Sequence, residues 1–196
     1  GNGSLGVGYA SDYFRRGALL SEEAVQAEAS YGFKAFGLDS SIGVFTNQAV
    51  TSGAVDAYII DADISGTWGD LVILSAGLEH AELVAGAANL DVGVSVGLKS
   101  VLSPTVSLYR DVDETLYTIE VAVSHSFDLD VATLSVGASY GQSETSSTVD
   151  VDYNAVGAAL TKSLSDTSSL ELSVTSVDSD SIARKTIVGA GINVKF

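Results

Sequence analysis

The stretch Asp91-Val92-Gly93-Val94-Ser95-Val96-Gly97-Leu98-Lys99 alternates apolar residues with small or polar ones at every position. Side chains of a β-strand point alternately to opposite faces, so the valines and the leucine share one face and the glycines and the serine share the other. The same period of two recurs from Tyr117 to Ser124 and from Ala132 to Tyr140. This pattern predicts strands of an antiparallel sheet with one apolar face and one polar face.

The polar face is made mostly of small residues, which is unusual for a water-soluble protein. A soluble β-sandwich buries its large apolar side chains and presents charged ones to water. Here Gly and Ser dominate the polar rows, which fits a barrel with aliphatic residues facing lipid and small residues facing a narrow lumen. We therefore expect Val92, Leu134, Val121, Ile60 and Ile192 on the outer wall, and Gly93, Ser135, Glu120, Asp61 and Asn193 on the inner wall.

Composition agrees with a barrel and excludes several other classes of protein. The chain has 196 residues, of which 46% are hydrophobic and only 17% are charged. No stretch approaches the roughly 18 consecutive apolar residues that a transmembrane helix needs. A net charge of −16 disfavours nucleic-acid binding, and the absence of cysteine excludes disulfides and thiolate metal sites. We expect no cofactor and no metal.

Connections between strands fall into two alternating sets. Short turns are predicted at 36–39, 68–71, 127–130 and 164–167, with a less similar one at 102–104. Longer and more polar segments lie between them, at 16–22, 48–53, 110–115, 142–148 and 178–183. This alternation is typical of the short turns and the longer loops at the two ends of a membrane barrel. We predict a single domain over residues 1–196, an all-β, closed, antiparallel, up-and-down transmembrane β-barrel of about twelve strands, with eight or ten as the fallback.

The segment from Val188 to Phe196 has an apolar row that ends in an aromatic residue. A last strand of this kind is similar to the assembly signal of bacterial outer-membrane barrels, here carried by Ile192, Val194 and Phe196. We therefore expect outer-membrane lipid and the barrel-assembly machinery as partners, and a homo-oligomer remains open. The chain contains no methionine, which predicts a processed N-terminus, by signal-peptide removal or by loss of the initiator residue alone.

Two segments carry a family resemblance. Tyr9-Ala10-Ser11-Asp12-Tyr13-Phe14-Arg15-Arg16-Gly17 resembles the "SDYxxRG" N-terminal strand of the TorF-type porins, which are bacterial outer-membrane proteins. The stretch from Pro104 to Asp111, with the segments after it up to Phe127, is similar to their central hairpin. The doubled arginine and the short first loop depart from the family pattern. The resemblance implies a barrel and, less directly, transport.

Charged residues on the small, polar face are candidates for lining a lumen. They are Asp12, Arg16, Glu28, Lys34, Asp61, Asp63, Glu79, Lys99, Glu120 and Glu171. Asp12 and Arg16 share one face of the first strand and Glu28 lies on the polar face of the next, so we expect these three to form a cluster. Such a cluster either filters ions or is a structural ion pair. Acids outnumber bases in the set, which favours cations.

An enzyme would have to use one of two histidines, His80 and His125. Lipid-modifying barrel enzymes use a His–Ser–Glu arrangement. The alternation places His125 toward lipid, whereas Ser124, Ser126 and Glu120 point inward, so these residues cannot form a triad. We therefore predict that the protein is not an enzyme.

The sequence predicts a narrow channel, or porin, for ions or small solutes in the outer membrane of a Gram-negative bacterium. We expect a weak preference for cations. The alternative is a non-catalytic structural or adhesive β-rich protein of a cell surface or a virion. A requirement for detergent would separate a membrane barrel from a soluble surface protein.

Overall fold

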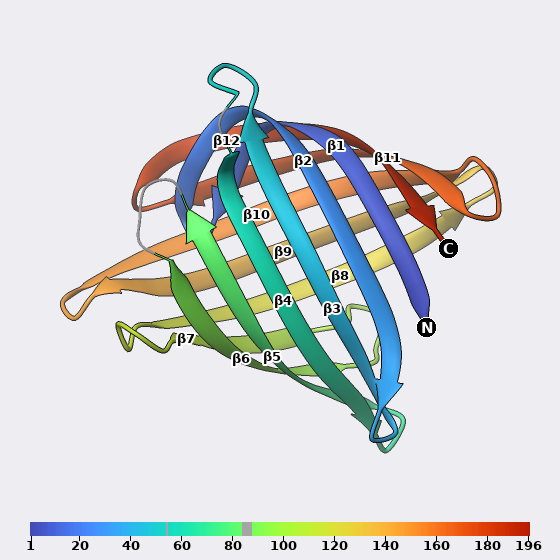
Figure 1. Cartoon of the computed structure of the whole chain (residues 1–196), viewed down its shortest axis with the longest axis horizontal. Coiled ribbons are helices and arrows are strands. Elements are labelled where there is room, and N and C mark those ends of the chain that lie inside the picture. Colours follow the sequence, from blue (N-terminus) through green and yellow to red (C-terminus); the bar gives the residue numbers. More distant parts are fainter. Residues whose placement is uncertain (54, 84–87) are drawn as a thin grey trace.

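A computed structural model describes residues 1–53, 55–83 and 88–196. The chain forms a closed barrel in which each strand pairs with its sequence neighbours and β1 pairs with β12, all antiparallel (Figure 1). The predicted twelve-stranded up-and-down barrel is confirmed. Its strands are β1 (Asn2–Arg15), β2 (Ala18–Ala35), β3 (Leu38–Ala49), β4 (Val55–Trp68), β5 (Val72–Leu83), β6 (Asn89–Leu98), β7 (Thr105–Asp111), β8 (Tyr117–Leu129), β9 (Ala132–Ser146), β10 (Val149–Ser163), β11 (Ser168–Ser179) and β12 (Ile182–Lys195).

Both termini lie at one end of the barrel, here named the terminal end, and the opposite end is named the loop end (Figure 1). The short turns predicted from the sequence all lie at the terminal end. Phe36 and Gly37 join β2 to β3, Gly69 and Asp70 precede β5, and all four have positive φ angles. Two consecutive positive φ angles are the mark of the type I′ turn, whose twist matches that of the flanking strands.

The wall is apolar on its outside, as the alternation predicts. Four of the five residues expected outside, Val92, Val121, Ile60 and Ile192, are between 41% and 50% exposed. Leu134 has the same orientation by register with Phe127 and Leu160 and is half-buried. A sandwich would have placed these rows in a dry interior, so the fold is that of a barrel with a lipid-compatible exterior. Among the described residues, no helix is long and apolar enough to cross a membrane.

The lumen is filled unevenly along the barrel axis. Its buried side chains gather in the half nearer the loop end: Ala24, Asn47, Ala57, Ile59, Ala81, Asp91, Thr118, Tyr153 and Val177. Toward the terminal end the inward positions of β1 and β12 are mostly glycine, because Gly6 and Gly8 lie opposite Asn193 and Gly191. The interior is therefore packed in one half and hollow in the other.

Candidate functional site

The tip of the β1–β2 hairpin, residues Tyr13–Gly17, folds into the lumen at its packed half. The pairing of β1 with β2 shifts register between Tyr13 and Phe14, and the turn residues Arg16 and Gly17 have φ angles of 47° and 88°. The tip touches walls that are far apart around the barrel. The Tyr13 ring lies 5.6 Å from that of Phe45 on β3, while the Phe14 ring lies 6.1 Å from that of Tyr153 on β10. The hairpin tip thus narrows the lumen from within.

Gly17 shows how closely the tip is fitted to the far wall. The Ser179 hydroxyl of β11 donates a hydrogen bond of 2.7 Å to its carbonyl oxygen. A Cβ atom at this position would lie 2.8 Å from a methyl group of Val151 on β10. A side chain here would therefore meet both the wall and the unfavourable positive φ.

Two arginines of the tip bind two acids of the opposite wall. Arg15 forms an ion pair with Glu79 of β5, and Arg16 forms one with Asp91 of β6 at 2.5 Å. The crossed contacts are also present, Arg15 with Asp91 at 4.0 Å and Arg16 with Glu79 at 3.8 Å. The Arg16 guanidinium lies 4.6 Å from the centroid of the Tyr109 ring. These contacts latch the tip against β5, β6 and β7.

The acids belong to a line of carboxylates that runs around the wall. Asp61 pairs in register with Glu79, Glu79 with Asp91, and Asp91 with Asp111, on four consecutive strands from β4 to β7. We name these four residues the carboxylate row. Like charges directly opposite each other on a sheet destabilise it, so the two guanidinium groups offset a repulsion built into the wall. Asp63 lies two residues from Asp61, also facing inward.

The hairpin tip separates cavities on its two sides. On the loop side a cavity of about 210 Å³ is lined by Arg15, Arg16, Asp91 and Tyr109, among others. On the terminal side a cavity of about 220 Å³ lies against Asp61, Asp63, Glu79 and Asp91. Asp91 therefore borders both spaces. The constriction lies between an outer vestibule and the inner lumen.

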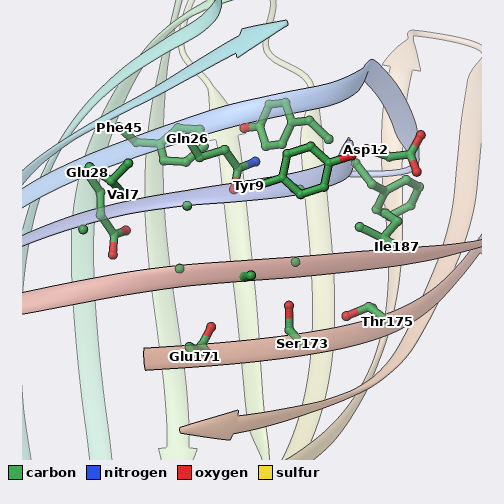
Figure 2. A pocket seen from close by; sticks show the side chains of 18 of the residues that line it. Val7, Tyr9, Asp12, Gln26, Glu28, Phe45, Glu171, Ser173, Thr175 and Ile187 are labelled. Carbon is green, nitrogen blue, oxygen red and sulfur yellow. The ribbon is translucent and has the colours of Figure 1, made fainter. Parts of the chain in front are cut away.

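An inner cavity of about 430 Å³ lies over the glycine-rich seam of β1 and β12 (Figure 2). In Figure 2, Gln26 and Glu28 lie on one side of it, and Glu171, Ser173 and Thr175 lie on the other. Asp12 also lines this cavity. Its Oδ1 atom forms an ion pair with Nζ of Lys185 on β12, at a distance of 2.6 Å. The cavity thus has polar side chains on two sides, and the glycines of β1 and β12 between them contribute little side-chain volume.

The structure places the residues expected to line the lumen in three regions. Asp12, Glu28 and Glu171 border the large inner cavity, while Asp61, Asp63 and Glu79 border the smaller one. Arg16 lies at the constriction, and Glu120 accepts a hydrogen bond of 2.8 Å from the Tyr153 hydroxyl. Lys34 and Lys99 lie elsewhere, at the terminal end. Lys34 is exposed and pairs with Asp39 at 2.5 Å, and Lys99 is exposed between β6 and β7.

The prediction that Asp12, Arg16 and Glu28 form a cluster is wrong. Asp12 pairs with Lys185, and Arg16 pairs with Asp91, which is 75 positions away in sequence. The physical reason is that the hairpin tip, with β1 paired to β2 as far as Arg15 and Ala18, packs inside the lumen against β3, β10 and β11. The long arginine side chains then reach the far wall.

Sequence reasoning missed several residues of this region: Arg15, Asp91, Tyr109 and Tyr153. The alternation did place Asp91 on the glycine face of its strand, so a signal for it existed. For Arg15 the alternation pointed the wrong way, because strict alternation puts it opposite Arg16. In the structure both arginines lie close to the same pair of acids, Glu79 and Asp91.

The histidines lie on the outer wall. His125 contacts Phe127 edge-on, and its Nδ1 atom lies 2.7 Å from the carbonyl oxygen of Val101. His80 lies 3.4 Å from Glu82. Within residues 1–53, 55–83 and 88–196, neither histidine pairs with an inward serine, and no group of three His, Asp or Glu side chains could hold a metal ion.

Comparisons with known proteins identify the fold. No protein-family model matches this chain, and no curated protein does. Among solved structures, a KdgM porin in complex with disordered oligogalacturonate has a TM-score of 0.65 at 13% identity, covering 98% of this chain and 99% of that one. This chain has the fold of the outer-membrane porins.

Two further structures support that conclusion. The NanC porin has a TM-score of 0.63 at 9% identity, with 98% of this chain and 99% of that chain covered. An outer-membrane channel from Pseudomonas putida F1 also has a TM-score of 0.63 at 9% identity, with 100% and 94% covered. At such low sequence identities the similarity shows a shared fold only. The function of the lumen residues has to be argued from the residues of this chain.

Proposed function

We propose that this protein is an outer-membrane barrel of a Gram-negative bacterium and forms a narrow, weakly cation-preferring channel for ions or small solutes. One observation carries the proposal: among the described residues, the only basic side chains that form ion pairs with the carboxylate row and Asp63 are Arg15 and Arg16. Carboxylates that outnumber cations around a narrow passage favour cation entry. The closed barrel and its apolar exterior supply the membrane-spanning wall.

The charge of the constriction distinguishes this lumen from that of a porin with an anionic ligand. The KdgM porin was captured with oligogalacturonate, a polyanion. In the present chain the same kind of solute would meet Asp61, Asp63 and the remainder of the carboxylate row. We therefore expect polyanions to be excluded, and small cations to be the permeant class.

The test is a reversal potential measured across planar bilayers under a KCl gradient. Wild-type protein should give a potential of the sign for cation preference, and the preference should weaken at about 1 M salt, where the screening length is about 3 Å. Asp61→Asn with Asp63→Asn should move the cation-to-anion permeability ratio toward one. Asp130→Asn, on the exposed β8–β9 turn, removes a charge outside the lumen and should change nothing. An anion-selective potential would overturn the proposal.

A structural or adhesive barrel is the second candidate, and the latched hairpin tip favours it. If Arg15 and Arg16 close the lumen completely, the working surface would be the acidic loop end. Folded protein that inserts into bilayers without any conductance would support this reading. A soluble surface or virion protein should stay monodisperse without detergent, whereas we expect aggregation because of the apolar exterior.

Several expectations belong to the same proposal. We expect outer-membrane lipid and the barrel-assembly machinery as partners, with Ile192, Val194 and Phe196 as the assembly signal, and a signal peptide removed from the precursor. Ile192 and Val194 face outward, and Phe196 exchanges backbone hydrogen bonds of 2.8 and 2.9 Å with Gly3. Membership of the TorF-type porins, a homo-oligomeric state and the lack of enzymatic activity also remain predictions.

A further inference from the structure

The carboxylate row has the properties of a preformed receptor for cationic groups. Asp61, Glu79 and Asp91 are each held on a paired strand, so their spacing is fixed by the barrel wall. Asp91 is only 2% exposed, and its Oδ1 atom is buried without a hydrogen-bond partner among the described residues. A buried carboxylate oxygen without a donor is costly, which favours the arrival of a further donor.

The row is only partly occupied. Arg15 and Arg16 bind Glu79 and Asp91. Asp61 and Asp63 border the adjoining cavity of about 220 Å³, and no described lysine or arginine forms an ion pair with either. The site therefore already binds guanidinium groups at one end and offers open carboxylates at the other. Planar guanidinium donors match carboxylate oxygens better than a compact cation without N–H groups does.

The present occupants are attached to the end of a hairpin. Arg15 and Arg16 lie at the end of a hairpin with a two-residue turn, beyond the register shift of β1. The pairing of β1 with β2 from Asn2 to Asp12 does not depend on them, nor does that of β1 with β12, which spans Ser4–Ala10. Departure of the tip from the carboxylate row breaks the Ser179–Gly17 hydrogen bond but leaves these wall pairings in place.

We propose that the carboxylate row is a binding site for the guanidinium or ammonium groups of small cationic solutes, and that Arg15 and Arg16 occupy it as tethered competitors. This inference rests on the proposed cation-preferring channel and names the class of solute that its constriction recognises. A solute that binds Glu79 and Asp91 displaces the hairpin tip and widens the path between the two cavities. In the absence of solute the arginines narrow it.

The competition gives a direct binding test on the detergent-solubilised full chain. The probe is agmatine, which has a guanidinium group at one end and an ammonium group at the other, and its affinity is measured by calorimetry. A short tether gives an effective concentration in the millimolar range. Removing the competitors with Arg15→Gln and Arg16→Gln should therefore tighten agmatine binding by about tenfold or more. Arg184→Gln removes an exposed arginine that pairs with Asp178 at 3.6 Å, and should leave the affinity unchanged.

A second variant shows where the probe binds. Glu79→Gln and Asp91→Asn are added to the arginine double variant, which then lacks both sides of the Arg15–Glu79 and Arg16–Asp91 ion pairs. Neither acid is left as a charge without its arginine. This variant should not bind agmatine. Tetramethylammonium, which has the charge but no N–H donors, should bind at least about tenfold more weakly than agmatine. The shift in gel mobility on heating verifies that each variant is a folded barrel.

Displacement of the tip is followed separately. The chain has no cysteine, so a spin label on Ala18→Cys, at an exposed position beside the turn, is unique. Agmatine should increase the mobility of this label in otherwise wild-type protein. An unchanged spectrum at saturating agmatine would overturn the displacement.

The results that would overturn the site are equally definite. They are an affinity unchanged by the arginine substitutions, no saturable binding to the arginine double variant, or binding that survives loss of Glu79 and Asp91. Failure of the channel proposal is distinguishable, because it is measured by the reversal potential. If the barrel binds agmatine in competition with the arginines but never conducts ions, the binding-site proposal is supported and the channel proposal is refuted.

Discussion

Tyr153 illustrates how single residues hold the constriction in place. It is 3% exposed, its hydroxyl donates a hydrogen bond of 2.8 Å to Glu120, and its ring supports Phe14 of the hairpin tip. Tyr153→Phe keeps the ring and removes the donor to a carboxylate. We expect it to lower the free energy of unfolding in urea by about 1.5–3 kcal/mol, because a hydrogen bond to a charged group is lost.

The matched control is Tyr117→Phe. Tyr117 is exposed on the outer wall, where its ring lies 5.6 Å from the Arg110 guanidinium carbon. Its hydroxyl is dispensable, so we expect a change within about 0.5 kcal/mol. Equal effects of the two substitutions would show that the Tyr153–Glu120 bond does not stabilise the interior.

At the scale of elements, the seam between β1 and β12 closes the barrel and depends on close approach of two backbones. A Cβ atom on Gly8 would lie 2.9 Å from the carbonyl oxygen of Ala190, which cannot rotate away. Gly8→Ala should therefore destabilise the barrel by about 1–3 kcal/mol through overpacking. The measurement is urea unfolding of the barrel in detergent micelles or lipid vesicles.

Gly32 provides the control for that substitution. It also lies in a strand, on β2, and the nearest atoms to its Cβ position are at 3.9 Å. Gly32→Ala should be neutral or should stabilise by about 0.4–1 kcal/mol, because alanine restricts the unfolded chain. If Gly8→Ala is as mild as Gly32→Ala, then the seam does not require glycine.

At the scale of the whole molecule, the barrel has its apolar surface outside and its polar surface inside, and adjacent residues test this directly. Val94 is 52% exposed on the outer wall, and Ser95 faces the inner cavity. Val94→Lys should cost about 2–4 kcal/mol in lipid vesicles, the cost of a lysine near the bilayer midplane. Ser95→Lys should fold normally and lower the cation preference of the lumen. Equal folding yields for both variants would contradict a lipid-facing outer wall.

Much of this architecture follows from local sequence. The alternation in 91–99 fixes which side chains share a face, because the period of a strand is two whatever the strand pairs with. The short turns follow from residues such as Gly37 and Gly69, which adopt positive φ. Strand number and the apolar exterior were therefore predictable without coordinates.

The candidate site was predictable only in part. Glu79 and Arg16 were placed inside by alternation, but their pairing was not, since Arg15 and Glu79 are 64 positions apart and Arg16 and Asp91 are 75 positions apart. Which acid an arginine reaches depends on the register of β4 to β7 and on the distance across the closed barrel. Neither quantity is encoded within one strand.

The sequence by itself determined a membrane barrel of about twelve strands with acids on its inner face, because strand periodicity and turn chemistry are local properties. Only the tertiary structure decided that the hairpin tip lies inside the lumen and places two arginines on the carboxylate row. The reason is physical. A hairpin tip becomes a constriction only when the opposite wall has closed around it, and closure is a property of all twelve strands together.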